Sequence, residues 1–134
     1  LETFMMRYAL IVVFGFLVVV AGQAQSSLDS LERALPSIVD DSLRHRALTQ
    51  LAEGLQYTQY KKAEAFTTEA LAIAERNKWD WALAETYKRI GFLSTIGGDY
   101  IRAIKYDNMG LELATQRNDS LAIAESLNFL GNDY

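Results

Sequence analysis

Few residues of this chain have a type and spacing that could carry out chemistry. His45 is the only histidine and there is no cysteine, so spacing assembles neither a zinc site nor a nucleophile–histidine pair. The pair Asp40-Asp41 stands at an expected helix start, where aspartate caps free backbone N–H groups. Gly97-Gly98 lacks the Lys-Ser/Thr that completes a phosphate-binding loop. We therefore predict no catalytic residues, no metal and no cofactor, and a His45 that is either at the surface or satisfied by a partner.

Composition favours a helical protein that does not bind nucleic acid. The 134 residues contain 13 Lys and Arg against 17 Asp and Glu, a net charge of −4, whereas nucleic-acid binders carry a basic patch. After Asp41 the chain is rich in Ala, Leu, Glu, Lys, Arg and Gln, the strong helix formers. No stretch alternates apolar and polar residues with the period of a strand. The prediction is an all-α fold, stabilised by its core because disulfides are absent.

The N-terminal part has the order of an export signal. Arg7 precedes the uncharged apolar run Tyr8–Ala21, and small and polar residues follow at Gly22–Gln25. The run is shorter than the roughly 20 residues of a membrane-spanning helix. We predict a signal peptide over residues 1–24, cleaved after Ala24, and an exported protein of the periplasm or cell envelope. The alternative is an uncleaved membrane anchor; otherwise membrane contact would need a segment downstream of this sequence.

The chain matches itself when it is shifted by 40 residues. YKKAEAFTTEALAIA aligns with YIRAIKYDNMGLELA, and WALAETYKRIG aligns with LAIAESLNFLG. Repeats of this length indicate stacked helix pairs, in which each pair buries its apolar face against a neighbour. The identities fall at small and apolar positions with helical spacing: Tyr60/Tyr100, Ala63/Ala103, Leu71/Leu111, Ala74/Ala114, Ala82/Ala122, Ala84/Ala124, Glu85/Glu125 and Gly91/Gly131.

Each repeat divides into two helices joined by a tight turn. In Gly97-Gly98-Asp99 glycine supplies a positive φ and aspartate caps the next helix. Asp80 and Asp119-Ser120 are expected to cap in the same way, with Trp81 in the core and Trp79 partly exposed. The expected helices span residues 43–57, 60–76, 80–95 and 100–117.

Residues 25–40 are expected to form a short helix and a linker. The helix would cover Ser26–Leu35 and end at Pro36, which cannot continue it. It would either cap the first repeat or serve as a loose tether.

These residues resemble a tetratricopeptide repeat. The family pattern has a large residue, Leu-Gly, a Gly-Asp-Tyr turn, a small residue and an aromatic. In AETYKRIGFLSTIGGDYIRAIKYDNMGLELA the matching positions are Tyr87, Ile90-Gly91, Gly98-Asp99-Tyr100, Ala103 and Tyr106. The departures are Ser94 for a Tyr, Gly110 for the final Ala, no linker Pro, and a 40-residue period where about 34 is common.

The resemblance implies an α-solenoid of antiparallel helix pairs over residues 41–134. The repeats would cover about 41–79, 80–119 and an incomplete 120–134, two and a half in all. Leu127, Leu130 and Tyr134 would lie on the first helix of the third repeat, so the chain is expected to be the N-terminal fragment of a longer array. The exposed face of this last helix could pair with a second copy of the chain.

In this family the first helices of successive repeats line a concave surface that binds peptides, which implies a protein or peptide partner. Lys88, Asn128 and Asn132 could hydrogen-bond a peptide backbone or carboxylate. The first repeat offers His45, Leu48 and Ala52, so the carboxylate clamp of chaperone-binding members is not reproduced. The alternative is that the lining residues are ordinary solvated helix residues. The expected lining positions are Glu85, Lys88, Phe92, Thr95, Glu125, Asn128 and Asn132.

The expected function is a non-catalytic scaffold of the cell envelope that binds proteins or peptides. Long-period repeats behind a signal peptide also resemble the N-terminal sensor regions of bacterial repeat-containing histidine kinases and regulators. The alternative is therefore the sensor portion of a signal-transduction protein whose output domain is missing. Kinase activity would then reside only in that missing part, and the gene sequence beyond Tyr134 would decide.

Overall fold

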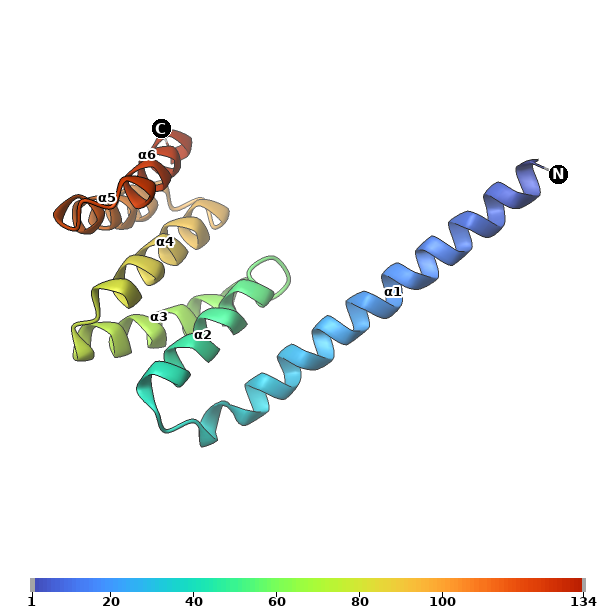
Figure 1. The fold of residues 1–134 in the computed structure, drawn as a ribbon, viewed down its shortest axis with the longest axis horizontal. Coiled ribbons are helices and arrows are strands. Elements are labelled where there is room, and N and C mark those ends of the chain that lie inside the picture. Colours follow the sequence, from blue (N-terminus) through green and yellow to red (C-terminus); the bar gives the residue numbers. More distant parts are fainter. Residues whose placement is uncertain (1, 134) are drawn as a thin grey trace. The chain divides into compact units, whose positions relative to one another are not determined.

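The structure, a computed structural model, describes the backbone of residues 2–133 and the side chains of residues 5–7, 9, 12, 13 and 22–132. It divides into two compact units, one up to Pro36 and one from Ser37 onward. No strand occurs among the described residues, which confirms the predicted all-α class. The elements (Figure 1) are α1 (Glu2–Ala34), the 3-10 turn η1 (Leu35–Ser37), α2 (Asp41–Leu55), α3 (Tyr60–Asn77), α4 (Asp80–Ile96), α5 (Tyr100–Gln116) and α6 (Ser120–Asp133).

The first unit is α1 with the first two residues of the short turn η1. The predicted helix Ser26–Leu35 forms the C-terminal part of α1 up to Ala34, and its last residue, Leu35, begins η1 just before Pro36. Most side chains of the predicted hydrophobic segment lie outside the described residues, and the helical backbone continues through Ala24. Within the described part of the chain, no helix combines the length and apolar character needed to cross a membrane. Cleavage after Ala24 stays a prediction.

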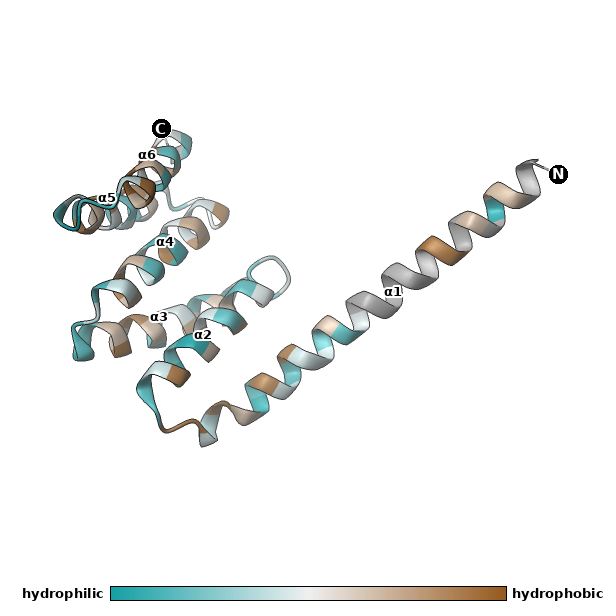
Figure 2. Cartoon of the chain, in the orientation of Figure 1, coloured by the Kyte–Doolittle hydropathy of each residue, from teal (hydrophilic) through white to brown (hydrophobic). Residues whose placement is uncertain are grey.

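The second unit is a stack of helices in which each packs against the next along the chain. α2 packs on α3, α3 on α4, α4 on α5 and α5 on α6, and α4 also contacts α6 (Figure 1). α3 and α5 begin at Tyr60 and Tyr100, two residues that the self-match pairs. Brown and teal residues alternate around these helices in Figure 2, as expected of amphipathic helices that bury one face. This arrangement is a solenoid-like array of packed helix pairs.

Small residues set the distance between the helices. Ala63 on α3 and Ala103 on α5, equivalent in the two repeats, are both 0% exposed. A Cβ built on Gly91 of α4 would lie 2.0 Å from Oδ1 of Asp107 on α5. The Asp107 side chain therefore occupies the space that a side chain at position 91 would need.

Three helices end in the same turn, although only one of the turns contains a glycine. Lys78, Gly98 and Asn118 have φ of 52°, 78° and 52°, in the left-handed region. At the Lys78 turn the Trp79 N–H donates to the Ala74 carbonyl at 3.2 Å, and the Lys78 N–H donates to the Glu75 carbonyl at 3.2 Å. The same pair of bonds recurs around Gly98 and Asn118. This is the Schellman motif, and the φ predicted for the Gly97-Gly98 turn belongs to Gly98.

Both ends of α2 differ from the prediction by two residues, and the C-terminal ends of α3, α4 and α5 each differ by one. α2 spans Asp41–Leu55 rather than 43–57 because the Asp40 side chain caps it, accepting the Leu43 N–H at 2.9 Å. α2 stops at Leu55 because the Leu55 carbonyl accepts from Thr58 and Gln59 in a turn, at 3.2 and 2.8 Å.

Two predictions at the start of α4 are wrong. Trp79, not Asp80, is the N-cap residue of α4, and Asp80 is the first residue of the helix. Trp79 is half-buried, as expected, whereas Trp81, predicted to lie in the core, is 43% exposed. The two rings stack with centroids 5.7 Å apart. Helical spacing does not apply to Trp79 because that residue precedes the helix.

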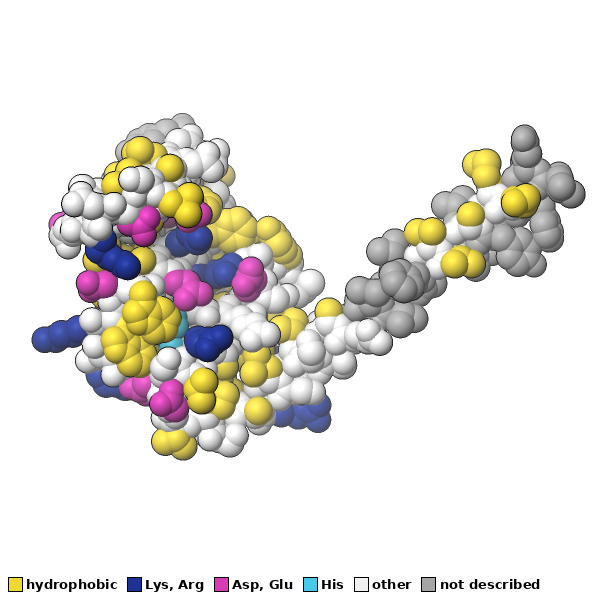
Figure 3. All heavy atoms as spheres, viewed as in Figure 1, with side chains coloured by type: hydrophobic (Ala, Val, Ile, Leu, Met, Phe, Trp, Pro, Cys, Tyr) yellow, Lys and Arg dark blue, Asp and Glu magenta, His cyan; other side chains and the backbone are white. Residues whose placement is uncertain are grey.

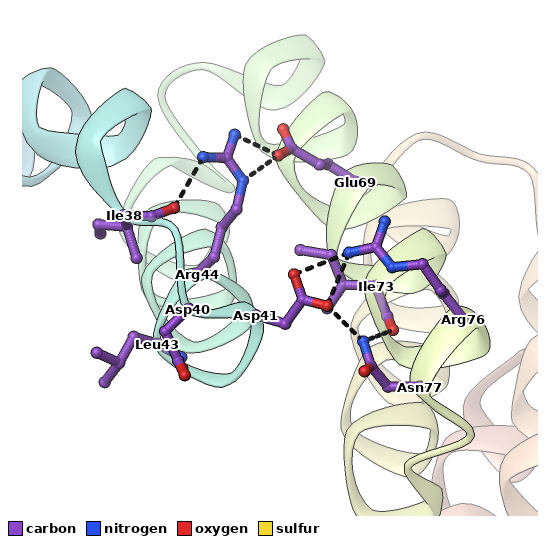
Figure 4. A network of polar contacts seen from close by, with 9 residues as sticks. All are labelled: Ile38, Asp40, Asp41, Leu43, Arg44, Glu69, Ile73, Arg76 and Asn77. Carbon is purple, nitrogen blue, oxygen red and sulfur yellow. Dashed lines mark hydrogen bonds and ion pairs between the residues drawn. The ribbon is translucent and has the colours of Figure 1, made fainter.

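Asp40 and Asp41 fasten the first helix pair in different ways (Figure 4). Asp40 caps α2, as predicted for this pair. Asp41 instead accepts from Arg76 at 2.8 Å and from Asn77 at 2.7 Å, both at the end of α3. These hydrogen bonds, first that of Arg76 and then that of Asn77, hold the pKa of Asp41 below its ordinary value. The carboxylate pair is therefore structural.

The last helix has one buried and one exposed leucine on the predicted face. Leu130 is 8% exposed, whereas Leu127 is 54% exposed. Tyr134 lies outside the described residues. Self-association through this face stays a prediction.

Candidate functional site

A hollow of about 320 Å³ is lined by the first helices of all three repeats. Its lining mixes charged, amide and aromatic side chains. We call the first helix of each pair, α2, α4 and α6, its A helix, and we name this hollow together with the smaller one beside it the A-helix surface. The larger hollow is lined by Glu53 of α2 and Gln56 just after it, Glu85, Lys88, Arg89 and Phe92 of α4, and Phe129 of α6.

The smaller hollow, of about 150 Å³, lies between α4, α5 and α6. It shares Glu85, Lys88 and Phe129 with the larger one, so the two are continuous along α4 and α6. Its remaining lining residues are Ala84, Tyr106, Asp107, Gly110, Ala122, Glu125 and Ser126.

Four of the seven predicted lining residues lie on this surface. Glu85, Lys88 and Phe92 line the larger hollow, and Glu125 lines the smaller. The Thr95 hydroxyl donates to the Gly91 carbonyl of its own helix at 3.1 Å, and Thr95 lines neither hollow. Asn128 and Asn132 are exposed and line neither hollow.

Sequence reasoning missed Arg89 and Phe129 on the same helices, and Glu53 on α2 with Gln56 just after it. Arg89 and Phe129 are four residues after Glu85 and Glu125. A stripe on one face of a helix covers positions i, i+3, i+4 and i+7. Including the i+4 position after Glu85 and Glu125 would therefore have added Arg89 and Phe129 to the predicted lining. Glu53 and Gln56 had no comparable signal, because the first repeat matches the others weakly.

Most charges on the A-helix surface are neutralised by a neighbour. The Lys88 ammonium lies 3.2 Å from the Glu125 carboxylate and so joins α4 to α6. The Arg89 guanidinium lies 3.4 Å from Glu53 and donates to the Gln56 side chain at 2.9 Å, joining α4 to α2. Figure 3 likewise shows basic, acidic and hydrophobic side chains interspersed on the face of the helix array toward the viewer.

Arg89 also carries an unsatisfied donor. Its side chain is only 16% exposed. Its Nε atom is buried with no hydrogen-bond partner among the described residues. Leaving such a donor unsatisfied is costly, and because the Nε atom is buried, it is the terminal guanidinium nitrogens, paired with Glu53 and Gln56, that make the described polar contacts of Arg89.

His45 belongs to the helix interface beneath this surface. Its side chain is 0% exposed, so of the two predicted alternatives the surface position is wrong. Its Nε2 atom lies 3.0 Å from the Thr86 hydroxyl, and its ring meets Trp81 edge to face at 5.3 Å. Among the described residues, no three His, Asp or Glu side chains are grouped as metal ligands would be.

Comparison with known proteins gives no family assignment. No protein-family model matches the chain, and no curated protein matches it in sequence.

Proposed function

We propose that the helix array is a tetratricopeptide-type scaffold whose A-helix surface binds a protein or peptide segment. The observation that carries the proposal is the hollow shared by α2, α4 and α6, whose lining combines Phe92 and Phe129 with charged and amide side chains. Aromatic side chains supply apolar contact area. Charged and amide side chains can hydrogen-bond the backbone of a bound peptide.

The family part of the proposal rests on packing as well as on motif. The 40-residue self-match coincides with the starts of α3 and α5. The small residues of the family pattern, Gly91 and Ala103, stand where the helices approach most closely. Neighbouring helix pairs bury one another's apolar faces, as in repeat proteins that present an extended binding surface.

Selection of peptides from a random library tests the binding function. Selected peptides should perturb backbone resonances of Glu85–Phe92 and of Glu125–Phe129. Phe92→Ala should weaken them about tenfold, because it removes a buried aromatic contact. Ile101→Ala, a change at an 85% exposed residue of α5, is the matched control and should leave affinity unchanged. Peptides that map elsewhere, or ignore Phe92→Ala, would contradict the proposal.

We propose further that the protein acts outside the cytoplasm. The support is the order of Arg7, an apolar run and small residues at the N-terminus. A reporter enzyme that is active only after export, fused after Gln25, should be active. An Ala21→Arg fusion is the control: a charge within the apolar run should abolish export. Equal activity of the two fusions would contradict this localisation.

A further inference from the structure

Glu85 differs from the other charged residues of the A-helix surface. It lines both hollows and is exposed. Lys88 is paired with Glu125, and Arg89 with Glu53. Glu85 makes no hydrogen bond and no ion pair among the described residues. The middle of this surface therefore presents one uncompensated negative charge, on the helix shared by both hollows.

An exposed indole lies one turn before Glu85 on the same helix. Residues i and i+4 of a helix share a face, and Trp81 is 43% exposed. Trp81 lines neither hollow and so extends the A-helix surface beyond Glu85 along α4. Trp81 stacks on Trp79 with an interplanar angle of 22°, so the two rings form a stacked aromatic platform. Trp81 and Glu85 both act on one residue of α2: the Trp81 ring contacts His45, and the Glu85 charge raises the pKa of His45 against the effect of burial.

A carboxylate beside an indole matches the chemistry of a basic side chain. The flexible stem of Lys or Arg packs on aromatic surface, its charge is attracted to the ring face, and the carboxylate supplies the counter-charge. An acidic segment would instead be repelled by Glu85, and the nearby cations Lys88 and Arg89 are already paired with Glu125 and Glu53. The net charge of −4 for the whole chain also favours association with a basic partner.

We propose that Trp81 and Glu85 receive a lysine or arginine side chain of the bound peptide. This inference rests on the proposed function, because it assigns the partner's charge at the same surface. The occupant is a basic peptide segment, and an acidic or neutral one is the competing outcome.

Four blocked peptides test this with one residue varied. They are acetyl-Ala-Ala-Leu-X-Leu-Ala-Ala-amide with X as Lys, Arg, norleucine or Glu. The chain has two tryptophans, both in the platform, so fluorescence of the 134-residue protein reports on the site directly. The Lys and Arg peptides should give saturable changes about five- to tenfold tighter than norleucine, and the Glu peptide should bind weakest. Raising the salt concentration should narrow these differences.

Two variants locate the effect. Glu85→Gln should remove most of the preference for the Lys and Arg peptides over the norleucine peptide and leave only the weaker attraction of the cation to the Trp81 ring. Glu75→Gln, the same change at an exposed residue of α3 that lines neither hollow, is the matched control and should retain the preference. Circular dichroism of both variants checks that they remain folded.

The outcomes separate the inference from the proposed function. Binding at the A-helix surface without a preference for Lys and Arg, or with a preference that Glu85→Gln leaves undiminished, overturns the inference alone. Failure of all four peptides and of library-selected peptides to bind this surface overturns both.

Discussion

His45 Nε2 lies 3.0 Å from the Thr86 hydroxyl and joins the first helix pair to the second. The Thr86 hydroxyl donates to the Ala82 carbonyl at 2.6 Å, so its oxygen is left to accept the Nε2–H of His45. The Nδ1 atom is buried with no hydrogen-bond partner among the described residues. A neutral imidazole therefore fits this interface, and a second proton would have no acceptor there.

This geometry predicts that stability falls as the pH falls below about 6.5, the ordinary pKa of histidine. Burial lowers the pKa of folded His45, and Glu85 and the Ala82 carbonyl oppose that shift only in part. Since the unfolded chain binds the proton more readily, the stabilisation is complete above the unfolded pKa and declines toward the folded pKa. The slope cannot exceed about 1.4 kcal/mol per pH unit for one proton.

Urea unfolding between pH 7.5 and 5.5 measures the slope, because His45 is the only histidine and ordinary carboxylates titrate at lower pH. His45→Gln should be less stable at pH 7.5 and should lose most of the pH dependence in this range. An equal slope in the variant would assign the pH dependence to another group.

Gly91→Ala should destabilise the protein by about 1–3 kcal/mol through overpacking. The added Cβ would fall 2.0 Å from Oδ1 of Asp107, and because Asp107 is buried its carboxylate could move only by displacing packed neighbours. Gly131→Ala is the matched control, because it is the same position of the next repeat and a Cβ there meets nothing within 4 Å. The control should be neutral or slightly stabilising, since alanine favours helix more than glycine. A melting temperature of Gly91→Ala that is unchanged, or that rises as in the control, would show that Gly91 matters only through helix propensity.

The fold was predictable because several independent features of the sequence predict the same helices. Periodic apolar positions, the self-match and the caps Asp40, Asp99 and Asp119 each place a helix, and all three side chains accept N–H groups of the first turn. The errors arose at single residues where local chemistry competes with pattern. Helical spacing predicts a core position for Trp81, which is 43% exposed, and the capping preference of aspartate predicts a cap at Asp80, which is the first residue of α4.

The binding surface was less predictable because it depends on contacts between helices distant in sequence. Nothing in the neighbourhood of Glu53 or Gln56 indicates that Arg89 lies against them. The buried position of His45 likewise depends on its contact with Thr86, 41 residues away. The left-handed turns at Lys78 and Asn118 were missed because neither residue is glycine, the usual signal for a positive φ.

Ala103→Leu should lower the free energy of unfolding by about 1–3 kcal/mol. Ala103 is 0% exposed, so three further carbons would have to displace packed neighbours. Ala72→Leu, at an exposed residue of α3, makes the same change without that crowding. The free energy of unfolding of this variant should stay within about 0.5 kcal/mol of that of the parent protein. Tolerance of Leu at position 103 would contradict the close packing of α5.

Lys78→Gly should stabilise the protein by about 0.5–1 kcal/mol, although it removes a side chain. Lys78 has φ of 52°, which costs an ordinary L-residue about 1–2 kcal/mol, and glycine avoids this cost while losing more chain entropy on folding. Asn118→Gly should gain less stability than Lys78→Gly, because asparagine tolerates this conformation.

Gly98→Ala, at φ of 78° in the equivalent turn, should lose about as much stability as Lys78→Gly gains. Lys78→Ala is the control: it keeps the backbone cost, so any gain shared with Lys78→Gly would come from loss of the lysine side chain. Thermal melts of the four variants measure these differences, and a loss of stability in Lys78→Gly would mean that the side chain of Lys78 outweighs its backbone strain.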